Sequence, residues 1–502
     1  MTGRAADVCL ILEGTYPYVT GGVSQWVHDL LGAQSDLTFH LVTLLAPGSD
    51  QTERYRLPDN VSGVTRLYLP DLRPGRREKK DDAALFAALE EPLIRLQSGG
   101  GLETLAAIRR ALEPGREQLG SEVLLNSRGA WKLLVRMYEQ THASSSFIQY
   151  FWGWRALLGG LYTALLCDLP AARVYHTVCT GYAGLLAARA RLETGRPAVL
   201  TEHGIYLNER RIEIALAEWL HEPQHQHLSV EQTLESVKDL WVGMFSGYAR
   251  ACYQACERVI TLFEGNQPLQ LADGADPRRM AVIPNGIRCE DPMPVRPEGR
   301  SRPPAVALIG RVVPIKDVKT FLRACHILRA RIPNLKAWVL GPTDEDLEYY
   351  EQCLQMVSYL NLEETVSFEG RVNLQEYFGR LDVLVLTSIS EAQPLVILEA
   401  GAYGIPTVAT NVGSCAEMIL GRSDEEPRLG PAGIVTPLAN PAATAEAVAR
   451  LLTDGAFYRR CSRAIRERLR RHYNKTDLDR SYRLLYEELR QAPDRLALDP
   501  AA

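Results

Sequence analysis

Short apolar runs alternate with longer amphipathic segments along most of this chain. Near the N-terminus, residues 8–12 form an apolar run, Gly21-Gly22 opens a helical pattern of apolar positions, and residues 39–45 form a second apolar run. Strands that alternate with helices predict a parallel sheet, because parallel strands need a long crossover connection. Further strands of the same sheet are predicted at residues 173–176, 198–202 and 258–262.

The second half of the chain repeats this alternation. The predicted helices lie at about 318–331, 345–359, 373–380 and 393–403, and the predicted strands lie at 305–309, 336–340, 365–368, 383–386 and 406–409. This pattern predicts a second doubly wound α/β domain, in which ligands bind beyond the carboxyl ends of the strands. The two halves therefore have one architecture, without an evident sequence repeat.

Three segments depart from the alternation. Residues from about 70 to 170 are mostly helical in pattern and poor in strand signals, which predicts a helical insertion in the first domain. Residues 289–304 contain five prolines and no periodicity, which is typical of a linker. We therefore expect a Rossmann-like domain over 1–288, a second one over 305–474, and a C-terminal helix within 475–502 that crosses back to the first domain.

Composition narrows the classes of function. The chain has 502 residues, 46% hydrophobic and 23% charged, which is typical of a globular protein with two domains. The formal net charge of −5 gives no reason to expect a nucleic-acid partner. Of the ten cysteines only Cys252 and Cys256 are close in sequence, and without a second pair they predict buried thiols and no zinc site. The longest apolar stretch, 156–167, is shorter than the roughly 20 residues of a spanning helix, so we expect a cytoplasmic protein.

Charged residues follow two predicted strands of the second domain. Arg311 comes after Gly310 at the end of strand 305–309, and Lys316 lies five residues further on. Two cations on one such loop can hold a diphosphate, although any exposed loop can carry them. Glu391 precedes a helix that begins near Pro394, whose first amides are free to bind phosphate, and Glu399 lies farther along that helix. Glu399 can accept hydrogen bonds from ribose hydroxyls, and a solvated glutamate is the alternative.

Two features of the first domain, and one of the second, have a plain structural alternative. Gly21-Gly22 lacks the GxGxxG spacing of a dinucleotide site, so the pair is either a ligand-contacting loop or a tight turn. His203 ends a predicted strand and can contact a sugar hydroxyl or relay a proton, but a lone histidine is more often structural. Asp344 and Asp346 have the Asp-x-Asp spacing of metal-dependent GT-A transferases, and we interpret them as helix-start carboxylates.

Together these motifs resemble glycosyltransferase family 4, the retaining enzymes of the GT-B fold. The matching residues are Gly21-Gly22, His203, Pro284-Asn-Gly, Gly310-Arg311 with Lys316, Gly370, and Glu391 with Glu399. The resemblance implies an α/β GT-B fold, with two doubly wound Rossmann-like domains that face a cleft. It places the acceptor side in residues 1–288 and the nucleotide-sugar site in 305–474.

The resemblance also implies a role for each residue. Arg311 and Lys316 would neutralise the donor diphosphate, Glu391 would contact the donor sugar, and Glu399 would hold the ribose. Further donor-binding positions in the second domain would be Gly310 and the helix start at Pro394, Leu395 and Val396. Gly370 and Arg371 would contact the base. From the first domain, Gly21, Gly22 and the catalytic His203 would complete the site. One departure concerns Ala392-Gln393-Pro394, where the family often has Gly-Phe-Gly, and it changes the wall around the donor sugar.

The implied reaction is transfer of a hexosyl unit from UDP-glucose or a UDP-N-acetylhexosamine to a growing exopolysaccharide, with retention and without a metal or other cofactor. Segment 12–26 and the helical insertion resemble more specifically the cytosolic transferases of Pel exopolysaccharide synthesis. Expected partners are the UDP-sugar, a glycan acceptor, and inner-membrane synthesis and export proteins that recruit the cytoplasmic protein. A UDP-sugar epimerase, another GT-B enzyme such as a sugar phosphorylase, and a non-catalytic scaffold of an export complex are the alternatives.

Overall fold

The computed structural model describes residues 5–49, 51–79, 82–216, 236–289 and 302–491. The chain divides into two compact units. Unit 1 comprises Met1–Thr261, Asn266–Val282 and Tyr482–Ala502, and unit 2 comprises Leu262–Gly265 and Ile283–Ser481. Each unit contains its own parallel sheet with helices against it, as the alternation of apolar runs and amphipathic segments predicts.

Unit 1 is built on a seven-stranded parallel sheet in the order β3-β2-β1-β4-β5-β6-β7. Its strands are β1 (Ala6–Glu13), β2 (Phe39–Leu45), β3 (Val61–Tyr68), β4 (Ala172–Thr177), β5 (Ala198–Glu202), β6 (Cys256–Thr261) and β7 (Met280–Val282). Strand β1 pairs with both β2 and β4, and its residues Val8 to Leu12 have no exposed surface. Helices on both faces of a parallel sheet explain why this strand is continuously apolar.

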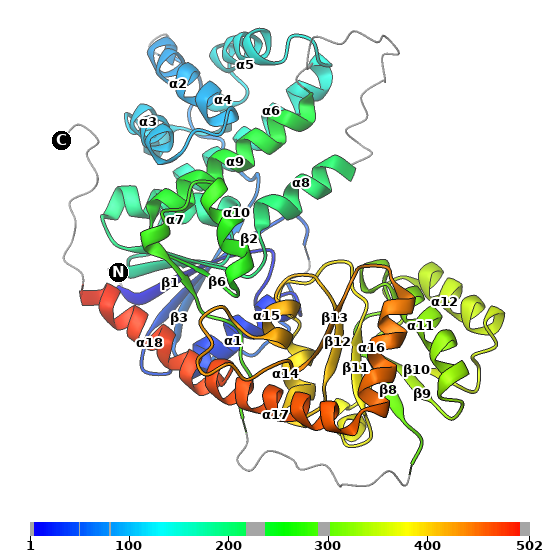
Figure 1. Cartoon of the computed structure of the whole chain (residues 1–502). Helices are drawn as coiled ribbons and strands as arrows, with labels where there is room; N and C mark the ends of the chain where they lie inside the picture. Colours follow the sequence, from blue (N-terminus) through cyan, green and yellow to red (C-terminus); the bar gives the residue numbers. More distant parts are fainter. Residues whose placement is uncertain (1–4, 50, 80–81, 217–235, 290–301, 492–502) are drawn as a thin grey trace. The chain divides into compact units, whose positions relative to one another are not determined.

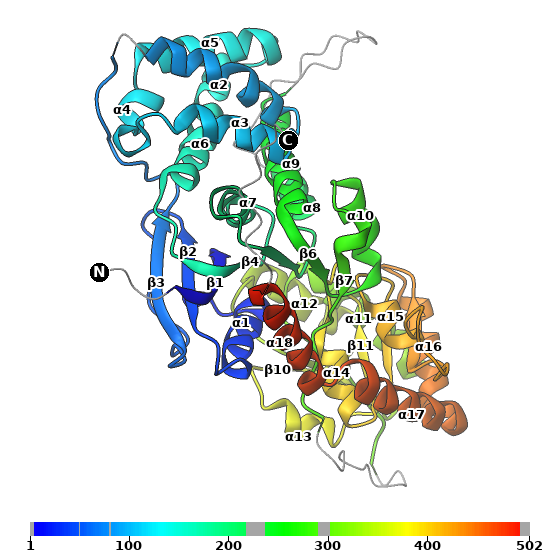
Figure 2. The ribbon, with the colours of Figure 1, turned by 90° about the vertical axis from the view of Figure 1, so that its left-hand side faces the viewer.

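The helices of unit 1 fall into two groups. Those beside the sheet are α1 (Gly22–Ala33), α7 (Tyr182–Thr194), α8 (Tyr206–Leu216), α9 (Val237–Ala255) and α10 (Gln267–Ala272). Those between β3 and β4 are α2 (Asp82–Gln97), α3 (Leu102–Leu112), α4 (Ser121–Leu124), α5 (Arg128–Thr141) and α6 (Phe147–Leu166). Both ribbon views show α2, α4 and α5 at the end of unit 1 that lies away from its sheet (Figures 1 and 2).

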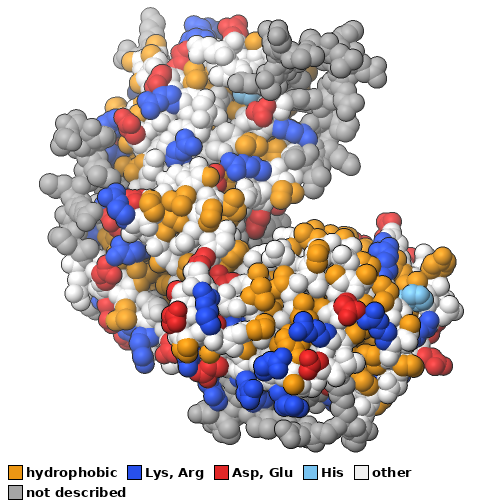
Figure 3. Space-filling model, in the orientation of Figure 1, with side chains coloured by type: hydrophobic (Ala, Val, Ile, Leu, Met, Phe, Trp, Pro, Cys, Tyr) orange, Lys and Arg blue, Asp and Glu red, His pale blue; other side chains and the backbone are white. Residues whose placement is uncertain are grey.

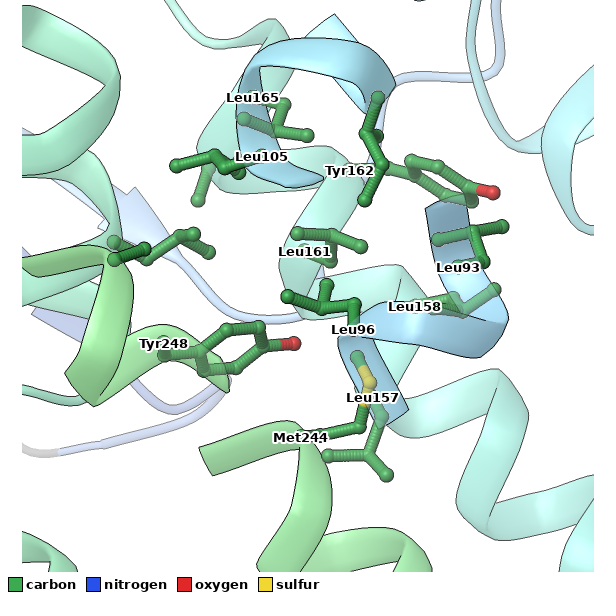
Figure 4. Close-up of a cluster of buried hydrophobic side chains, with 14 of the residues drawn as sticks. Leu93, Leu96, Leu105, Leu157, Leu158, Leu161, Tyr162, Leu165, Met244 and Tyr248 are labelled. Atoms are coloured by element: carbon green, nitrogen blue, oxygen red, sulfur yellow. The ribbon is translucent and has the colours of Figure 1, made fainter. Parts of the chain in front are cut away.

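A core of leucines joins this second group of helices to α9. Leu96 of α2, Leu157 and Leu161 of α6, and Met244 and Tyr248 of α9 are buried in one cluster (Figure 4). Helix α6 is apolar around most of its circumference because α2, α7 and α9 all pack near it, as expected for a helix enclosed on several sides. The helical region is therefore anchored to the sheet of unit 1 by a shared core.

Unit 2 has a six-stranded parallel sheet in the order β10-β9-β8-β11-β12-β13. Its strands are β8 (Ala305–Ile309), β9 (Lys336–Leu340), β10 (Val366–Gly370), β11 (Val383–Leu386), β12 (Thr407–Thr410) and β13 (Gly433–Thr436). Its helices are α11 (Val318–Arg331), α12 (Leu347–Tyr359), α13 (Leu374–Phe378), α14 (Leu395–Ala402), α15 (Cys415–Leu420), α16 (Pro441–Thr453), α17 (Gly455–His472) and the start of α18 (Lys475–Gln491).

A close backbone contact joins the ends of β8 and β9. Gly341 has a φ of 151°, and a Cβ at this position would collide with the carbonyl oxygen of Gly310. Only glycine adopts this conformation and leaves this space, so the loops that follow the two strands can approach each other. This places the Gly310 loop beside the loop that follows β9.

The limits of the units differ from the sequence prediction in three places, because Leu262–Gly265, residues 283–288 and residues 475–481 belong to unit 2. Residues 283–288 lie in unit 2, because Ile287 pairs with Asn474 and the Gln393 side chain bonds to both the amide and the carbonyl of Asn285. Residues 290–301 of the predicted linker and 492–502 of the predicted C-terminal segment lie outside the described residues. Within the described ranges, no helix combines the length and the apolar character needed to cross a membrane.

Candidate active site

The predicted site residues lie at carboxyl ends of strands or at helix starts, and they are divided between the two units. Unit 1 contains Gly21, Gly22 and His203. Unit 2 contains Gly310, Arg311, Lys316, Gly370, Arg371, Glu391, Pro394, Leu395, Val396 and Glu399. The two groups are described separately, each within its own sheet.

Lys316 and Glu391 form the tightest polar contact of the unit 2 site. Lys316 Nζ donates to Glu391 Oε1 at 2.5 Å, and Ser388 Oγ donates to the same oxygen at 2.6 Å. The side chains of Lys316 and Glu391 are 18% and 11% exposed, so the pair borders solvent and is not part of the core. A charge pair at this position can exchange partners when an anionic ligand arrives.

Backbone contacts hold the loops that carry this pair. Asp317 has a φ of 43°, which turns the chain between Lys316 and helix α11. Thr387 Oγ1 donates to the carbonyls of Lys316, at 3.1 Å, and Asp317, at 2.9 Å. The amide of Ile389 donates to the carbonyl of Ile315 at 2.8 Å. The loops after β8 and β11 are therefore one connected structure. Thr387 and Ser388 were not predicted as site residues. The signal that could have identified them is their position as polar residues directly after the apolar run 383–386.

Arg311 is not part of that contact. Its side chain is 54% exposed and pairs with Glu345 at 2.7 Å, and Arg371, which is 72% exposed, approaches Asp344 at 3.5 Å. Exposed pairs of this kind contribute little to stability, so both arginines can turn to another anion at low cost. Asp346 accepts from the amide of Tyr349 at 2.9 Å and caps α12, so its interpretation as a helix-start carboxylate is confirmed.

Helix α14 supplies amide donors and a carboxylate. It begins at Leu395 after the N-cap residue Pro394, and no side chain caps it. The amides of Leu395 and Val396 have no carbonyl one turn earlier to bond, so they are available to a ligand. Burial raises the pKa of Glu399, and among the described residues its carboxylate has neither a hydrogen bond nor an ion pair. A half-buried carboxylate without donors suits an incoming hydroxyl group.

In unit 1, His203 is buried and neutral. Burial lowers its pKa to about 4, and its ring packs edge-on against Trp26 with ring centres 4.8 Å apart. Its Nε2 atom is buried without a hydrogen-bond partner among the described residues. The nearby His176 differs, because both of its ring nitrogens are hydrogen bonded, to Tyr486 at 2.7 Å and to Thr201 at 2.9 Å. His203 is thus the histidine of this pair with a nitrogen left for a ligand.

Glu202, which the sequence analysis did not single out, lies beside His203 and is buried. Its carboxylate accepts from Tyr253 Oη at 2.7 Å, Gln270 Nε2 at 3.0 Å and the amide of Tyr206 at 3.1 Å. Burial is the largest influence on this group and raises its pKa to about 7. The residue fixes the end of β5 to α8, α9 and α10, and so holds the backbone that carries His203. The sequence signal that could have identified Glu202 is a single glutamate within a predicted buried strand.

The paired glycines open helix α1. Gly21 precedes its first residue, Gly22, and both are exposed, with no atom within 4 Å of where a Cβ would lie. No side chain caps this helix, so the amides of its first turn are available. Cys252 of α9 and Cys256, which begins β6, are both buried as predicted, with their sulfurs 3.9 Å apart. Within the described ranges, no three metal-ligating side chains gather.

Comparisons with known families give a match in each half of the chain. Residues 6–278 match the family described as a domain of unknown function (DUF3492), and residues 303–454 match "Glycosyl transferases group 1". A D-inositol 3-phosphate glycosyltransferase of Streptomyces scabiei is 32% identical over 155 residues, which are 28% of this chain and 35% of that protein. The chain spans about a third to three fifths of the length of the curated relatives it matches, between 31% and 58%.

Solved structures match over nearly the whole chain. Sucrose-phosphate synthase from Thermosynechococcus elongatus has a TM-score of 0.56 at 17% identity and covers 97% of this chain and 99% of its own. HepE of Anabaena in complex with UDP has a TM-score of 0.57 at 13% identity, covering 96% and 99%. At these identities the likeness shows the fold alone, and the predicted fold of two Rossmann-like α/β domains of the GT-B type is confirmed. The chain therefore belongs to the DUF3492 family, and its residues 303–454 are similar to the glycosyltransferase group 1 family.

Proposed function

We propose that this protein transfers a hexosyl unit from a UDP-sugar, UDP-glucose or a UDP-N-acetylhexosamine, to a growing exopolysaccharide. In this proposal it is a retaining, metal-independent transferase of family 4 and of the Pel type (PelF-like). The observation that carries the proposal is the contact of Lys316 Nζ with Glu391 Oε1 at 2.5 Å, beside the uncapped start of α14. A cation, a carboxylate and free amides at one sheet edge match the chemistry of a sugar diphosphate.

The chemical demand on such an enzyme is the charge that builds on the departing UDP. Lys316 and the first amides of α14 are fixed donors, which stabilise that charge without reorganising during the reaction. Arg311 can leave its exposed pair with Glu345 and add a second cation. These side chains neutralise a diphosphate without requiring a metal ion, and this supports the metal-independent form of the proposal.

The two glutamates have different roles in this scheme. Glu399 has no donor of its own and is half-buried, so it accepts hydrogen bonds from the ribose hydroxyls of the nucleotide. Glu391 already accepts from Lys316 and from Ser388, and both contacts reduce the nucleophilicity of its carboxylate. This supports a role for Glu391 in binding the donor sugar and not in forming a covalent glycosyl-enzyme.

The acceptor side of the proposal rests on unit 1. His203 is neutral and presents Nε2 without a partner among the described residues, which suits a sugar hydroxyl better than a charged group. The exposed start of α1 at Gly21 and Gly22 provides further backbone donors. The glycan acceptor, the cytoplasmic location and the recruitment by inner-membrane synthesis and export proteins are parts of the same proposal.

The experiment is calorimetric titration of UDP, ADP and GDP in the presence of a chelator. We expect UDP to bind selectively to the wild-type chain and to bind at least tenfold more weakly to Arg311→Ala/Lys316→Ala, as loss of two charged contacts implies. Lys336→Ala is the matched control, because Lys336 begins β9 at the amino edge of the same sheet and donates to the carbonyl of Glu364. Its UDP affinity should equal that of the wild type.

Turnover then separates the alternatives. Incubation with each UDP-sugar and an acceptor glycan should release UDP in chelator, and NMR of the product should show the donor's anomeric configuration. Conversion of the UDP-sugar without UDP release would replace the transferase proposal with an epimerase. Absence of all nucleotide binding would favour a scaffold of an export complex, and inversion at the anomeric carbon would contradict the retaining mechanism.

A further inference from the structure

Helix α5, in the helical region of unit 1, exposes a stripe of basic and aromatic residues. At 100° per residue, Arg128, Trp131, Lys132 and Arg136 fall on one side of the helix, together with Glu139 near its end. The opposite side is buried in the helical core and consists of Ala130, Leu133, Leu134 and Met137. Trp131 is 51% exposed, although the core has room for apolar side chains on the other side of the same helix.

A cavity of about 530 Å³ opens beside this stripe. Its lining includes the apolar residues Ala83 and Phe86 and one carboxylate, Glu78. It also includes four cationic side chains, those of Lys79, Arg128, Lys132 and Arg136. The carboxylate is already used, because Glu78 accepts from the amides of Arg128, at 3.1 Å, and Gly129, at 2.7 Å. Arg136 pairs with Glu90, whereas the side chains of Arg128 and Lys132 have no ion pair within the described residues.

The excess of positive charge distinguishes this cavity from the largest of the cavities described in unit 1. A larger cavity of unit 1, of about 800 Å³, is lined by three arginines and four carboxylates, so its charges are nearly balanced. There Arg189 and Arg116 both pair with Glu193. The cavity beside α5 is therefore the one of these two whose lining requires an anion.

Exposed aromatic side chains continue from α5 onto α6. Trp152 is 62% exposed and Ile148 is 70% exposed, one helical turn apart on α6. The rings connect across the two helices, with centres 6.2 Å apart for Trp131 and Phe151, and 5.0 Å apart for Phe151 and Trp152. Among the described residues, the exposed tryptophans are Trp131 and Trp152. Below, the α5–α6 surface denotes Arg128, Trp131, Lys132, Ile148 and Trp152.

We propose that the α5–α6 surface binds directly to an anionic phospholipid bilayer, with a headgroup phosphate in the basic cavity. Basic side chains attract an anionic leaflet, and tryptophan rings prefer the headgroup level of a membrane, where one side is apolar and the other is wet. The helical region combines both kinds of side chain on α5 and the start of α6. Helix α5 lies at the end of unit 1 away from its sheet (Figure 2). The inference goes beyond the proposed function and holds whether or not the chain transfers a sugar.

A second basic surface provides the test of this choice. Lys and Arg side chains gather along α17 in unit 2 (Figure 3), where the exposed ones are Arg459, Arg460, Arg463, Arg470 and Arg471. That helix turns its apolar residues inward, among them Phe457, Ile465 and Leu469, and the exposed tryptophans named above are not on it. If positive charge alone determined which surface binds the bilayer, α17 would bind it. If binding depends on positive charge together with aromatic rings, the α5–α6 surface binds it.

The experiment measures sedimentation of the full chain with vesicles of phosphatidylcholine, with and without phosphatidylglycerol. We expect binding to the anionic vesicles and a loss of at least ~30-fold in partitioning for Arg128→Glu/Lys132→Glu, given the usual contribution of a basic residue near such a surface. Arg460→Glu/Arg463→Glu makes the same change of formal charge on α17 and should keep more than half of the binding. Circular dichroism and thermal melting establish that each variant is folded.

The tryptophans are tested separately from the charges. Trp131→Phe/Trp152→Phe should abolish the blue shift of tryptophan emission that the anionic vesicles cause in the wild-type chain. Failure of the wild-type chain to bind the anionic vesicles at low salt would overturn the proposal. Recruitment of the chain to a membrane would then depend on partner proteins. A loss of binding in the α17 variant and not in the α5 variant would overturn it as well.

Discussion

Polar side chains at the carboxyl edge of the sheet border solvent in unit 2 but are buried in unit 1. In unit 2, Lys316 and Glu391 lie at the border of solvent, with 18% and 11% of their side chains exposed. In unit 1, Glu202 and His203 are buried, with 1% and 8% of the residue surface exposed. Burial disfavours the charged form of any such group, so it moves the pKa of Glu202 to about 7 and that of His203 to about 4.

This difference indicates what each edge is suited to bind. Charges at an accessible edge can neutralise a diphosphate, whereas neutral donors and acceptors suit the hydroxyl groups of a glycan. A GT-B enzyme needs both kinds of edge, one for the nucleotide and one for the acceptor. Four substitutions test this division.

Replacing Lys316 tests the charged edge. We expect Lys316→Ala to lower turnover of the UDP-sugar roughly 10²–10³-fold, as removal of a fixed donor from developing negative charge does, about 2.7–4 kcal/mol. The measurement is UDP release at saturating donor, with Lys336→Ala as the control. Turnover of Lys316→Ala within twofold of the wild type would show that unit 2 does not use this charge.

Replacing Glu202 tests the neutral edge. A carboxyl whose pKa rises from 4.5 to about 7 on folding destabilises the native state as pH increases through that interval, because the folded protein holds its proton longer. From pH 4.5 to pH 8, Glu202→Gln should therefore gain on the order of 3 kcal/mol of unfolding free energy relative to the wild type. Denaturant unfolding at several pH values measures the difference.

The geometry around Glu202 favours a folded variant. Gln270 Oε1 is buried without a partner, so it can accept from the new amide after the Gln270 side chain flips. Glu446→Gln is the control, since the Glu446 side chain is 67% exposed on α16 and its replacement should not alter the pH dependence. An equal slope for Glu202→Gln and the wild type would mean that Glu202 is not protonated on folding.

Replacing Glu399 tests the ribose contact. Because its carboxylate has no donor among the described residues, Glu399→Gln should weaken UDP binding roughly tenfold to a hundredfold, as loss of a charged hydrogen bond does. The same substitution should barely change the affinity for the deoxy-UDP that lacks the contacted hydroxyl. Calorimetry with UDP, 2′-deoxy-UDP and 3′-deoxy-UDP makes the comparison, and an equal loss for all three would place Glu399 elsewhere in the site.

Replacing Ser388 tests the support of the charged pair. Its hydroxyl donates to Glu391 at 2.6 Å, and losing such a bond costs about 1 kcal/mol, so Ser388→Ala should weaken donor binding about fivefold. Ser367→Ala removes a hydroxyl bond of the same length, 2.6 Å, to Glu369 and should leave donor binding unchanged. Equal effects of the two variants would mean that Glu391 is positioned by Lys316 alone.

The strands were predictable where most of their residues are buried. The bounds of Phe39–Leu45, Ala198–Glu202, Ala305–Ile309, Lys336–Leu340 and Val383–Leu386 agree with the predicted ones, because an apolar run flanked by polar residues marks a strand buried on both faces. Strand β3 shows no such run, since its residues are only partly buried. Strand β7 has only three residues, and β13 begins with a glycine and is only partly buried. Helices α16 and α17 were also not predicted.

The candidate site was predicted as a set of residues, and the contacts among those residues were not predicted. Sequence spacing indicated Lys316 and Glu391 separately, but their contact joins loops after β8 and β11, which lie 75 residues apart. The pairing of Arg311 with Glu345 likewise depends on β8 and β9 being neighbours in the sheet. Local patterns contain no information on such pairings, because the order of strands is decided by the packing of the whole domain.

Helix α18 has a consequence for the order in which the chain is made. Its residues from Tyr482 onward belong to unit 1, where Tyr486 bonds to the buried His176 and Arg483 pairs with Asp36. On a ribosome, these residues emerge after all of unit 2, so the first unit to be translated is the last to be completed. A recombinant fragment that stops at Val282 would lack them, and it would need residues 482–491 supplied as a fused or separate peptide.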